Sequence, residues 1–133
     1  MIDNSAMDDR SILVVEDEEG VRIVVRAALE QVGYRVTTAA NGIEATRLLE
    51  DEHFGLVLTD VLMPDKDGIE IISDLRREYP ELPVIAMSGG GRLPRDGYLT
   101  IARHIGAHAI LEKPFTVDEL LATVDRLLAP ASA

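Results

Sequence analysis

Apolar runs of strand length alternate along this chain with segments of helical spacing, and this alternation limits the possible folds more than any other feature. Most of the runs are rich in β-branched residues, as expected for strands that are buried on both faces. The apolar runs cover residues 11–17, 34–39, 56–60, 83–88 and 109–112. The expected helices cover residues 21–32, 41–52, 68–79, 98–105 and 117–128. Five strand-helix units predict a parallel sheet with helices on both faces, which is an α/β doubly wound fold.

Local signals mark the ends of several expected helices. Gly33 follows the first helix at a position where glycine commonly ends one. Pro80 closes the third helix, and Thr116 lies where an N-cap is expected before the last one.

Four of the expected strands lead into a polar side chain suited to phosphoryl chemistry. These side chains are Glu16 and Asp17 after the first strand, Asp60 on the third, Ser88 on the fourth and Lys113 after the fifth. In an open parallel sheet, ligands bind in the crevice beyond the carboxyl ends of the strands. We therefore expect three carboxylates, a hydroxyl and an ammonium group to share one edge of the sheet.

A third carboxylate beside Glu16 and Asp17 indicates a bound cation. Taken alone, two adjacent acids before a helix are equally well explained as groups that complement the helix dipole. Asp60 adds repulsion that a hard cation with oxygen ligands would offset. Mg²⁺ fits best, because it is held by one or two carboxylates and completes its octahedron with waters and phosphate oxygens. Mn²⁺ is a possible substitute.

Lys113 and Ser88 each have a simpler explanation as well. Lys113 is alternatively a surface lysine next to a loop, and Ser88 can satisfy a backbone group at the end of its strand. Facing three acids, Lys113 is better explained as a counter-charge that also holds a transferred phosphoryl group. Ser88 beside it can donate to a phosphoryl oxygen. The three histidines have no paired spacing and are expected to be ordinary surface or hydrogen-bonded residues.

The composition limits the class of protein and its partners. The chain has 133 residues, of which 47% are hydrophobic and none is cysteine; this suits one domain without disulfides. A net charge of −11 without a clustered basic face argues against direct binding to nucleic acid. No apolar run is long enough to cross a membrane, and the start lacks a secretory signal, so a cytoplasmic location is expected. Residues 1–10 and 130–133 are expected to be tails around a domain at 11–129.

Four segments, taken in order, resemble the receiver domain of two-component response regulators. They are ILVVEDEEGVR at 12–22, DVLMPDKDG at 60–68, MSG at 87–89 and EKPF at 112–115. The resemblance extends from about residue 11 to residue 128. It implies the flavodoxin-like (βα)5 fold with strand order 2-1-3-4-5.

The resemblance also implies a role for each site residue. Asp60 would accept a phosphoryl group, while Glu16 and Asp17 would hold Mg²⁺ directly or through water. The backbone carbonyl of Leu62 would be a further ligand, and Ser88 and Lys113 would contact the phosphoryl group.

The same resemblance implies the partners. A histidine kinase or a histidine phosphotransfer protein would supply the phosphoryl group, and the phosphorylated form would act on a downstream protein target. The chain would be a monomer or a weak homodimer, and its only chemistry would be the self-catalysed phosphorylation and dephosphorylation of its own aspartate.

Two features depart from the usual pattern of the family. An aromatic residue usually stands three positions before the lysine, but this chain has Ile110 there and so lacks the usual aromatic switch. The segment between Ser88 and Lys113 is also longer than in compact members, with GGGRLPRDG at 89–97 as the expected insertion. Rearrangement of this glycine-rich loop and of the helix near Tyr98 is expected to carry the signal.

Other functions stay open at this point. The leading hypothesis is a stand-alone receiver, and a receiver trimmed from a larger regulator is its closest alternative. A phosphatase or phosphotransferase acting through an aspartyl-phosphate usually needs a cap domain, for which 133 residues leave no room. A binding module with a vestigial acidic site is the third hypothesis.

Overall fold

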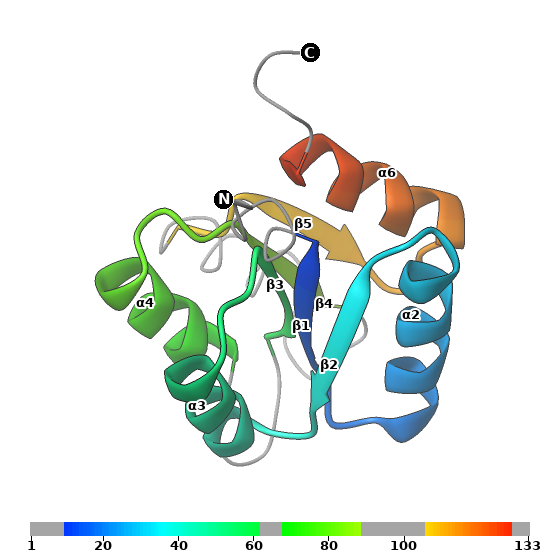
Figure 1. The fold of residues 1–133 in the computed structure, drawn as a ribbon. Coiled ribbons are helices and arrows are strands. Elements are labelled where there is room, and N and C mark those ends of the chain that lie inside the picture. Colours follow the sequence, from blue (N-terminus) through cyan, green and yellow to red (C-terminus); the bar gives the residue numbers. More distant parts are fainter. Residues whose placement is uncertain (1–9, 62–67, 89–105, 129–133) are drawn as a thin grey trace, which may run out of the picture.

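A five-stranded parallel sheet forms the centre of the molecule, with its strands in the order β2-β1-β3-β4-β5 (Figure 1). The computed structural model describes residues 10–61, 68–88 and 106–128. The strands are β1 (Ser11–Val15), β2 (Arg35–Ala39), β3 (Leu56–Asp60), β4 (Val84–Ser88) and β5 (Ala109–Glu112). The predicted parallel sheet and its strand order are therefore confirmed.

Helices cover both faces of the sheet. They are α2 (Glu19–Gln31), α3 (Gly42–Asp51), α4 (Gly68–Glu78) and α6 (Val117–Leu128). Helices α2 and α6 lie on one face, whereas α3 and α4 lie on the other (Figure 1). The predicted helix at 98–105, the glycine-rich loop at 89–97, the tail at 130–133 and residues 1–9 of the tail predicted at 1–10 lie outside the described residues.

Each face of the sheet has its own apolar core. In β1, Ile12 and Val14 pack in the cluster with α2 and α6, while Leu13 and Val15 pack in the cluster with α3 and α4. This division follows from the period of two along a strand. All four side chains are fully buried, so β1 is covered on both sides, as its continuous apolar run predicts.

The element boundaries differ from the sequence predictions by one or two residues at several ends. Strand β4 begins at Val84 and not at Pro83, because proline has no N–H to donate, although the carbonyl of Pro83 still accepts from the N–H of Val57 at 3.0 Å. Helix α2 begins at Glu19 and ends at Gln31. Gly33 then adopts a φ of 100°, the left-handed conformation in which glycine ends a helix.

Reciprocal side-chain bonds cap the start of α6. The N–H of Glu119 donates to Oγ1 of Thr116, and the N–H of Thr116 donates to Oε1 of Glu119, both at 3.0 Å. This is the capping box expected of a threonine followed three residues later by a glutamate. The cap predicted at Thr116 is thus present, and it fixes where α6 starts after the loop that carries Lys113.

A buried tyrosine ties α6 to the turn between α2 and β2. The hydroxyl of Tyr34 donates to Oδ1 of Asp125 at 2.7 Å. Burial and this carboxylate raise the pKa of Tyr34 to about 12, so the phenol remains a donor at neutral pH. The guanidinium of Arg10 lies 4.5 Å from the centre of the Tyr34 ring, on which it stacks as a cation.

A histidine joins the start of β5 to the start of β4. The backbone N–H of His108 donates to the carbonyl of Val84 at 2.8 Å, and Nδ1 of His108 accepts from the N–H of Val84 at 3.1 Å. Partial burial and the charge of Arg76 lower the pKa of His108, which keeps its ring neutral and able to accept. Two residues earlier, Gly106 has a φ of 110°, and a Cβ there would lie 2.8 Å from Nε of Arg76, so this position requires glycine.

Among the helices that the structure describes, none combines the length and the apolar character needed to cross a membrane.

Candidate functional site

The register of the sheet brings the carboxyl ends of β1, β3 and β5 to one edge. Val15 of β1 pairs with Thr59 of β3, so the residues that follow, Glu16 and Asp60, are level with each other. At the other side of β3, the N–H of Val61 donates to the carbonyl of Met87 and extends the ladder by one residue. The ends of the strands thus set the acidic residues side by side before any side-chain contact is made.

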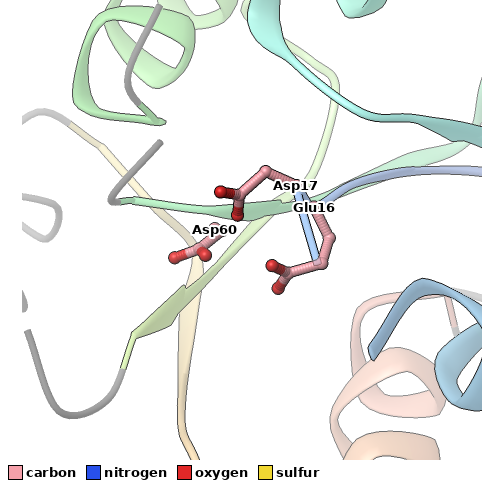
Figure 2. A group of neighbouring side chains, drawn as sticks. All are labelled: Glu16, Asp17 and Asp60. Atoms are coloured by element: carbon pink, nitrogen blue, oxygen red, sulfur yellow. The ribbon is translucent and has the colours of Figure 1, made fainter. Parts of the chain in front are cut away.

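Three carboxylates gather at this edge. One oxygen from each of Glu16, Asp17 and Asp60 lies within 4.8 Å of the other two. Figure 2 shows their side chains turned toward the same space beyond the strand ends. Glu16 is 0% exposed and Asp60 is 6% exposed, while Asp17 is exposed. The cluster is therefore open to solvent on the side of Asp17 and closed on the side of Glu16.

Lys113 supplies a cation to two of the three acids. Its ammonium donates to Oε1 of Glu16 at 2.6 Å and to Oδ2 of Asp60 at 3.2 Å. The lysine side chain is 19% exposed, which places the pair in surroundings where water screens the charges only in part. Lys113 comes from the loop after β5, and the capped start of α6 follows three residues later.

Every polar group of Glu16 has a partner in the protein. Its N–H donates to the carbonyl of Ala39 at 3.0 Å, and its own carbonyl accepts from Arg22 at 2.8 Å. Its two carboxylate oxygens accept from Lys113 and, at 3.2 Å, from the N–H of Glu18. Both carboxylate oxygens of Glu16 are therefore already engaged by donors within the protein.

In the ion pair of Glu16 and Lys113, burial favours the neutral form of each group, whereas the partner favours the charged form. Burial raises the pKa of Glu16 to about 7; the hydrogen bond from Lys113 opposes the rise and the charge of Asp60 adds to it. For Lys113, burial works to lower the pKa, but the hydrogen bond to Glu16 and the charges of both acids prevail and raise it. The three carboxylates around Lys113 leave the site with excess negative charge that a proton or a metal ion can neutralise.

The remaining predicted site residues are described only in part. Ser88 ends β4 opposite Glu112 of β5, but its side chain lies outside the described residues, as does the whole of Leu62. Ile110 is half-buried and packs against the core on the α3 and α4 side of the sheet. The structure thus brings together Glu16, Asp17, Asp60 and Lys113.

Sequence reasoning missed one residue of this site. Arg22 of α2 donates to the backbone carbonyls of both Glu16 and Asp17. The sequence signal was a basic residue in the first turn of a helix, where cations oppose the helix dipole and need another reason to be present.

Comparison with known proteins gives the family of the chain. A family model described as the response regulator receiver domain matches residues 12–125. The chain belongs to the response regulator receiver family. Receiver domains are generally non-enzymatic signalling modules that bind Mg²⁺ and interact with histidine kinases and downstream effectors. The acidic cluster at the strand ends of this receiver is of a kind that can hold such a metal.

Individual relatives are similar over nearly the whole receiver. Sporulation initiation phosphotransferase F of Bacillus subtilis is 33% identical over 122 residues, which is 92% of this chain and 96% of that protein. The solved receiver domain of NtrX from Brucella abortus is 31% identical with a TM-score of 0.83, covering 90% of this chain and 99% of that one.

Longer regulators also match through their receiver segments. The transcriptional regulator NtrC of a Bradyrhizobium strain is 36% identical over 121 residues, 90% of this chain but 24% of that protein. YkoG of Bacillus subtilis, named as an uncharacterized transcriptional regulatory protein, is matched over 50% of its length. The chain spans about a quarter to a half of the length of these curated relatives.

Proposed function

We propose that this receiver accepts a phosphoryl group on Asp60 in a Mg²⁺-dependent reaction and thereby switches its interactions with other proteins. The observation that carries the proposal is the position of Lys113, whose ammonium lies 3.2 Å from Oδ2 of Asp60 at the centre of the acidic cluster. An ammonium group that already touches the accepting carboxylate is placed to hold an incoming phosphoryl oxygen.

The donor set fits Mg²⁺ in both chemistry and charge. Asp17 and Asp60 would bind the ion directly, together with the backbone carbonyl of Leu62, while Glu16 would act through water because both of its oxygens already accept hydrogen bonds. Mn²⁺ would suit the same oxygen ligands. When bound, the ion supplies positive charge that neutralises the oxygens of a phosphoryl group in transfer.

Phosphoryl transfer from a phosphohistidine to Asp60 depends more on the positioning of the reacting groups than on covalent chemistry by the protein. An oxygen of Asp60 forms a bond to phosphorus as the nitrogen–phosphorus bond of a phosphohistidine breaks, and the imidazole keeps the electron pair. The product is an acyl phosphate with up to about two negative charges. Lys113 balances part of this charge from its place between Glu16 and Asp60. Attack of water on the same phosphorus breaks the bond between phosphorus and the Asp60 oxygen, which releases inorganic phosphate and returns Asp60 to its free carboxylate, so both steps occur on the receiver itself.

The phosphoryl donor is a histidine kinase or a histidine phosphotransfer protein, and the readout is a downstream protein target. Ser88 would donate its hydroxyl to the phosphoryl group and so report phosphorylation to the segment that follows β4. Ile110 has no ring or hydroxyl with which to follow that movement, so the signal passes through the glycine-rich loop and the segment near Tyr98. The receiver domain proper is residues 11–129, acting in the cytoplasm as a monomer or weak homodimer.

Incubation with a small phosphodonor and Mg²⁺, followed by intact mass measurement, tests the proposal. The wild type should gain one phosphoryl group, and neither the Asp60→Asn variant nor the wild type in EDTA should do so. A wild type that stays unmodified would favour the vestigial binding module. Turnover of small phosphate esters without a phosphorylated intermediate would favour a phosphatase. The full-length gene product decides between a stand-alone receiver and one trimmed from a larger regulator.

A further inference from the structure

An arginine of α2 holds the backbone of the acidic pair. Nη1 of Arg22 donates to the carbonyl oxygen of Glu16 at 2.8 Å and to that of Asp17 at 3.2 Å. Arg22 lies in the first turn of α2, where its backbone N–H donates to the carbonyl of Glu18 at 3.0 Å. Long side chains in a helix lean toward its N-terminus, and this direction carries the guanidinium back over the loop that bears the acids.

The loop that Arg22 holds is short. Val15 is the last residue of β1 and Glu19 the first of α2, so residues 16–18 make the whole connection. Carbonyls at such a junction have left the sheet ladder without entering the helix, and they need other donors. Arg22 supplies donors to two of them from a single nitrogen.

The position of Asp17 depends on this backbone. Glu16 is fully buried and fixed by partners on both carboxylate oxygens. Asp17 is exposed, so packing does not hold its side chain, and the direction of its carboxylate follows from the backbone from which it projects. Its oxygen nonetheless lies within 4.8 Å of an oxygen of Asp60.

The choice of carbonyls as acceptors also matters for a metal site. A guanidinium bound to the carboxylate of Asp17 would compete with a cation for the same oxygens. Because Arg22 donates to the carbonyls of Glu16 and Asp17, its guanidinium does not occupy the carboxylate of Asp17, while its positive charge remains close to the acidic loop.

We propose that Arg22 is a positioning residue for the Mg²⁺ site: by holding the carbonyls of Glu16 and Asp17, it directs the carboxylate of Asp17 toward Asp60. This inference rests on the proposed function, since it takes the acidic cluster to be the Mg²⁺ site. It makes Arg22 act through Asp17 and not on the phosphoryl group.

Titration of Mg²⁺ into the unphosphorylated protein, followed by backbone amide shifts in NMR, tests the inference. Loss of a residue that orients a metal ligand typically weakens metal affinity by about tenfold or more, so Arg22→Met should raise the Kd for Mg²⁺ by about that factor. Arg26→Met is the matched control one turn further along α2, where Arg26 is exposed and pairs with Glu30 at 3.1 Å. The control should bind Mg²⁺ as the wild type does.

A merely structural role predicts a different pattern, and a double-variant cycle with Asp17→Asn separates the two. If Arg22 acts through Asp17, adding Arg22→Met to Asp17→Asn should change the Mg²⁺ affinity no further. An Arg22→Met protein that binds Mg²⁺ like the wild type, or one whose loss is undiminished in the Asp17→Asn background, overturns the inference. Should Arg22→Met fold poorly, Arg22→Gln, which keeps a side chain with one amide donor, is measured against the same two outcomes.

The wild-type titration separates this inference from the proposed function. If the wild type and Arg22→Met bind Mg²⁺ equally well, only the proposed role of Arg22 is overturned. A wild type that does not bind Mg²⁺ at all removes the metal site and the role of Arg22 together.

Discussion

The ammonium of Lys113 lies 2.6 Å from Oε1 of Glu16 and 3.2 Å from Oδ2 of Asp60, so one cation is shared between two carboxylates that are themselves close to a third. The site is therefore short of positive charge. This imbalance gives it a measurable response to metal, to pH and to the loss of either partner.

Mg²⁺ should stabilise the folded wild type in proportion to its binding. At a concentration of 100 times its Kd, the ion should raise the free energy of unfolding by about 2.7 kcal/mol, which is a rise of several degrees in Tm. In EDTA, Asp60→Asn should melt above the wild type, because it removes one of three crowded negative charges. Sodium chloride at matched ionic strength controls for screening. A Tm that responds to neither change would mean that the acids do not repel one another.

Removal of Lys113 should leave a buried carboxylate without its cation. In EDTA at pH 8, Lys113→Met should lower the free energy of unfolding by about 3 kcal/mol, since breaking a buried pair leaves an uncompensated charge. Adding Glu16→Gln to Lys113→Met should restore much of the loss, because the pair is then removed as a whole. Urea unfolding of the four proteins measures this, and simple additivity of the two single changes would contradict it.

Without metal, the free energy of unfolding should depend on pH in the way that titration of Glu16 predicts. Its pKa is raised in the folded state from 4.5 to about 7, so it contributes stability that is complete below pH 4.5 and is lost as the pH rises through 7. The wild type should thus lose on the order of 2 kcal/mol relative to Glu16→Gln between pH 5 and pH 8. The comparison is made in EDTA by urea unfolding at each pH. Parallel profiles for the two proteins would show that the carboxyl titrates normally.

His108 should make the free energy of unfolding rise with pH, which is the opposite of the effect of Glu16. Its pKa is lowered in the folded state, so it contributes stability that is present above the unfolded pKa near 6.5 and is lost as the pH falls through the folded value. The causes are partial burial and the charge of Arg76, and the neutral ring is the form in which Nδ1 accepts from the N–H of Val84. Relative to His108→Phe, the wild type should therefore gain stability as the pH rises from 5 to 7.5. His53→Phe, a change at an exposed histidine, is the matched control for the loss of an imidazole.

The bond between Tyr34 and Asp125 should couple α6 to the turn before β2. Tyr34→Phe should cost about 1.5 to 3 kcal/mol of stability, the usual value for a hydrogen bond to a charged acceptor. Asp125→Ala should cost a similar amount, because it leaves the buried phenol without its acceptor. The double variant should cost little more than either single change, and a full sum of the two would mean that the residues act independently.

Sequence reasoning found the sheet and the position of the site for a physical reason. The apolar runs that form β1 and β3 are buried on both faces, so they permit few alternatives to a central parallel strand. Once the strands are parallel, residues that follow them must meet at one edge. Glu16, Asp17 and Asp60 needed no further information to be placed together.

The finer features of the site depend on contacts between distant residues and were not predictable. Glu16, the buried member of the acidic pair, has as its cation partner Lys113, which lies 97 positions away in the sequence. The role of Arg22 depends on the direction of a long side chain across a three-residue loop. His108 was expected to be an ordinary surface or hydrogen-bonded histidine, and only the fold shows that its partner is the backbone of β4.

Because Lys113 and Glu16 are far apart in the sequence, an incomplete chain cannot form the ion pair between them. These partners meet only after the first and the last strand have joined the same sheet, and contacts that are distant in sequence form only once the intervening chain is ordered. A chain that has lost its last strand keeps Asp60 but lacks the ammonium group that contacts it. Under the proposed function, phosphorylation of Asp60 would therefore require the complete sheet.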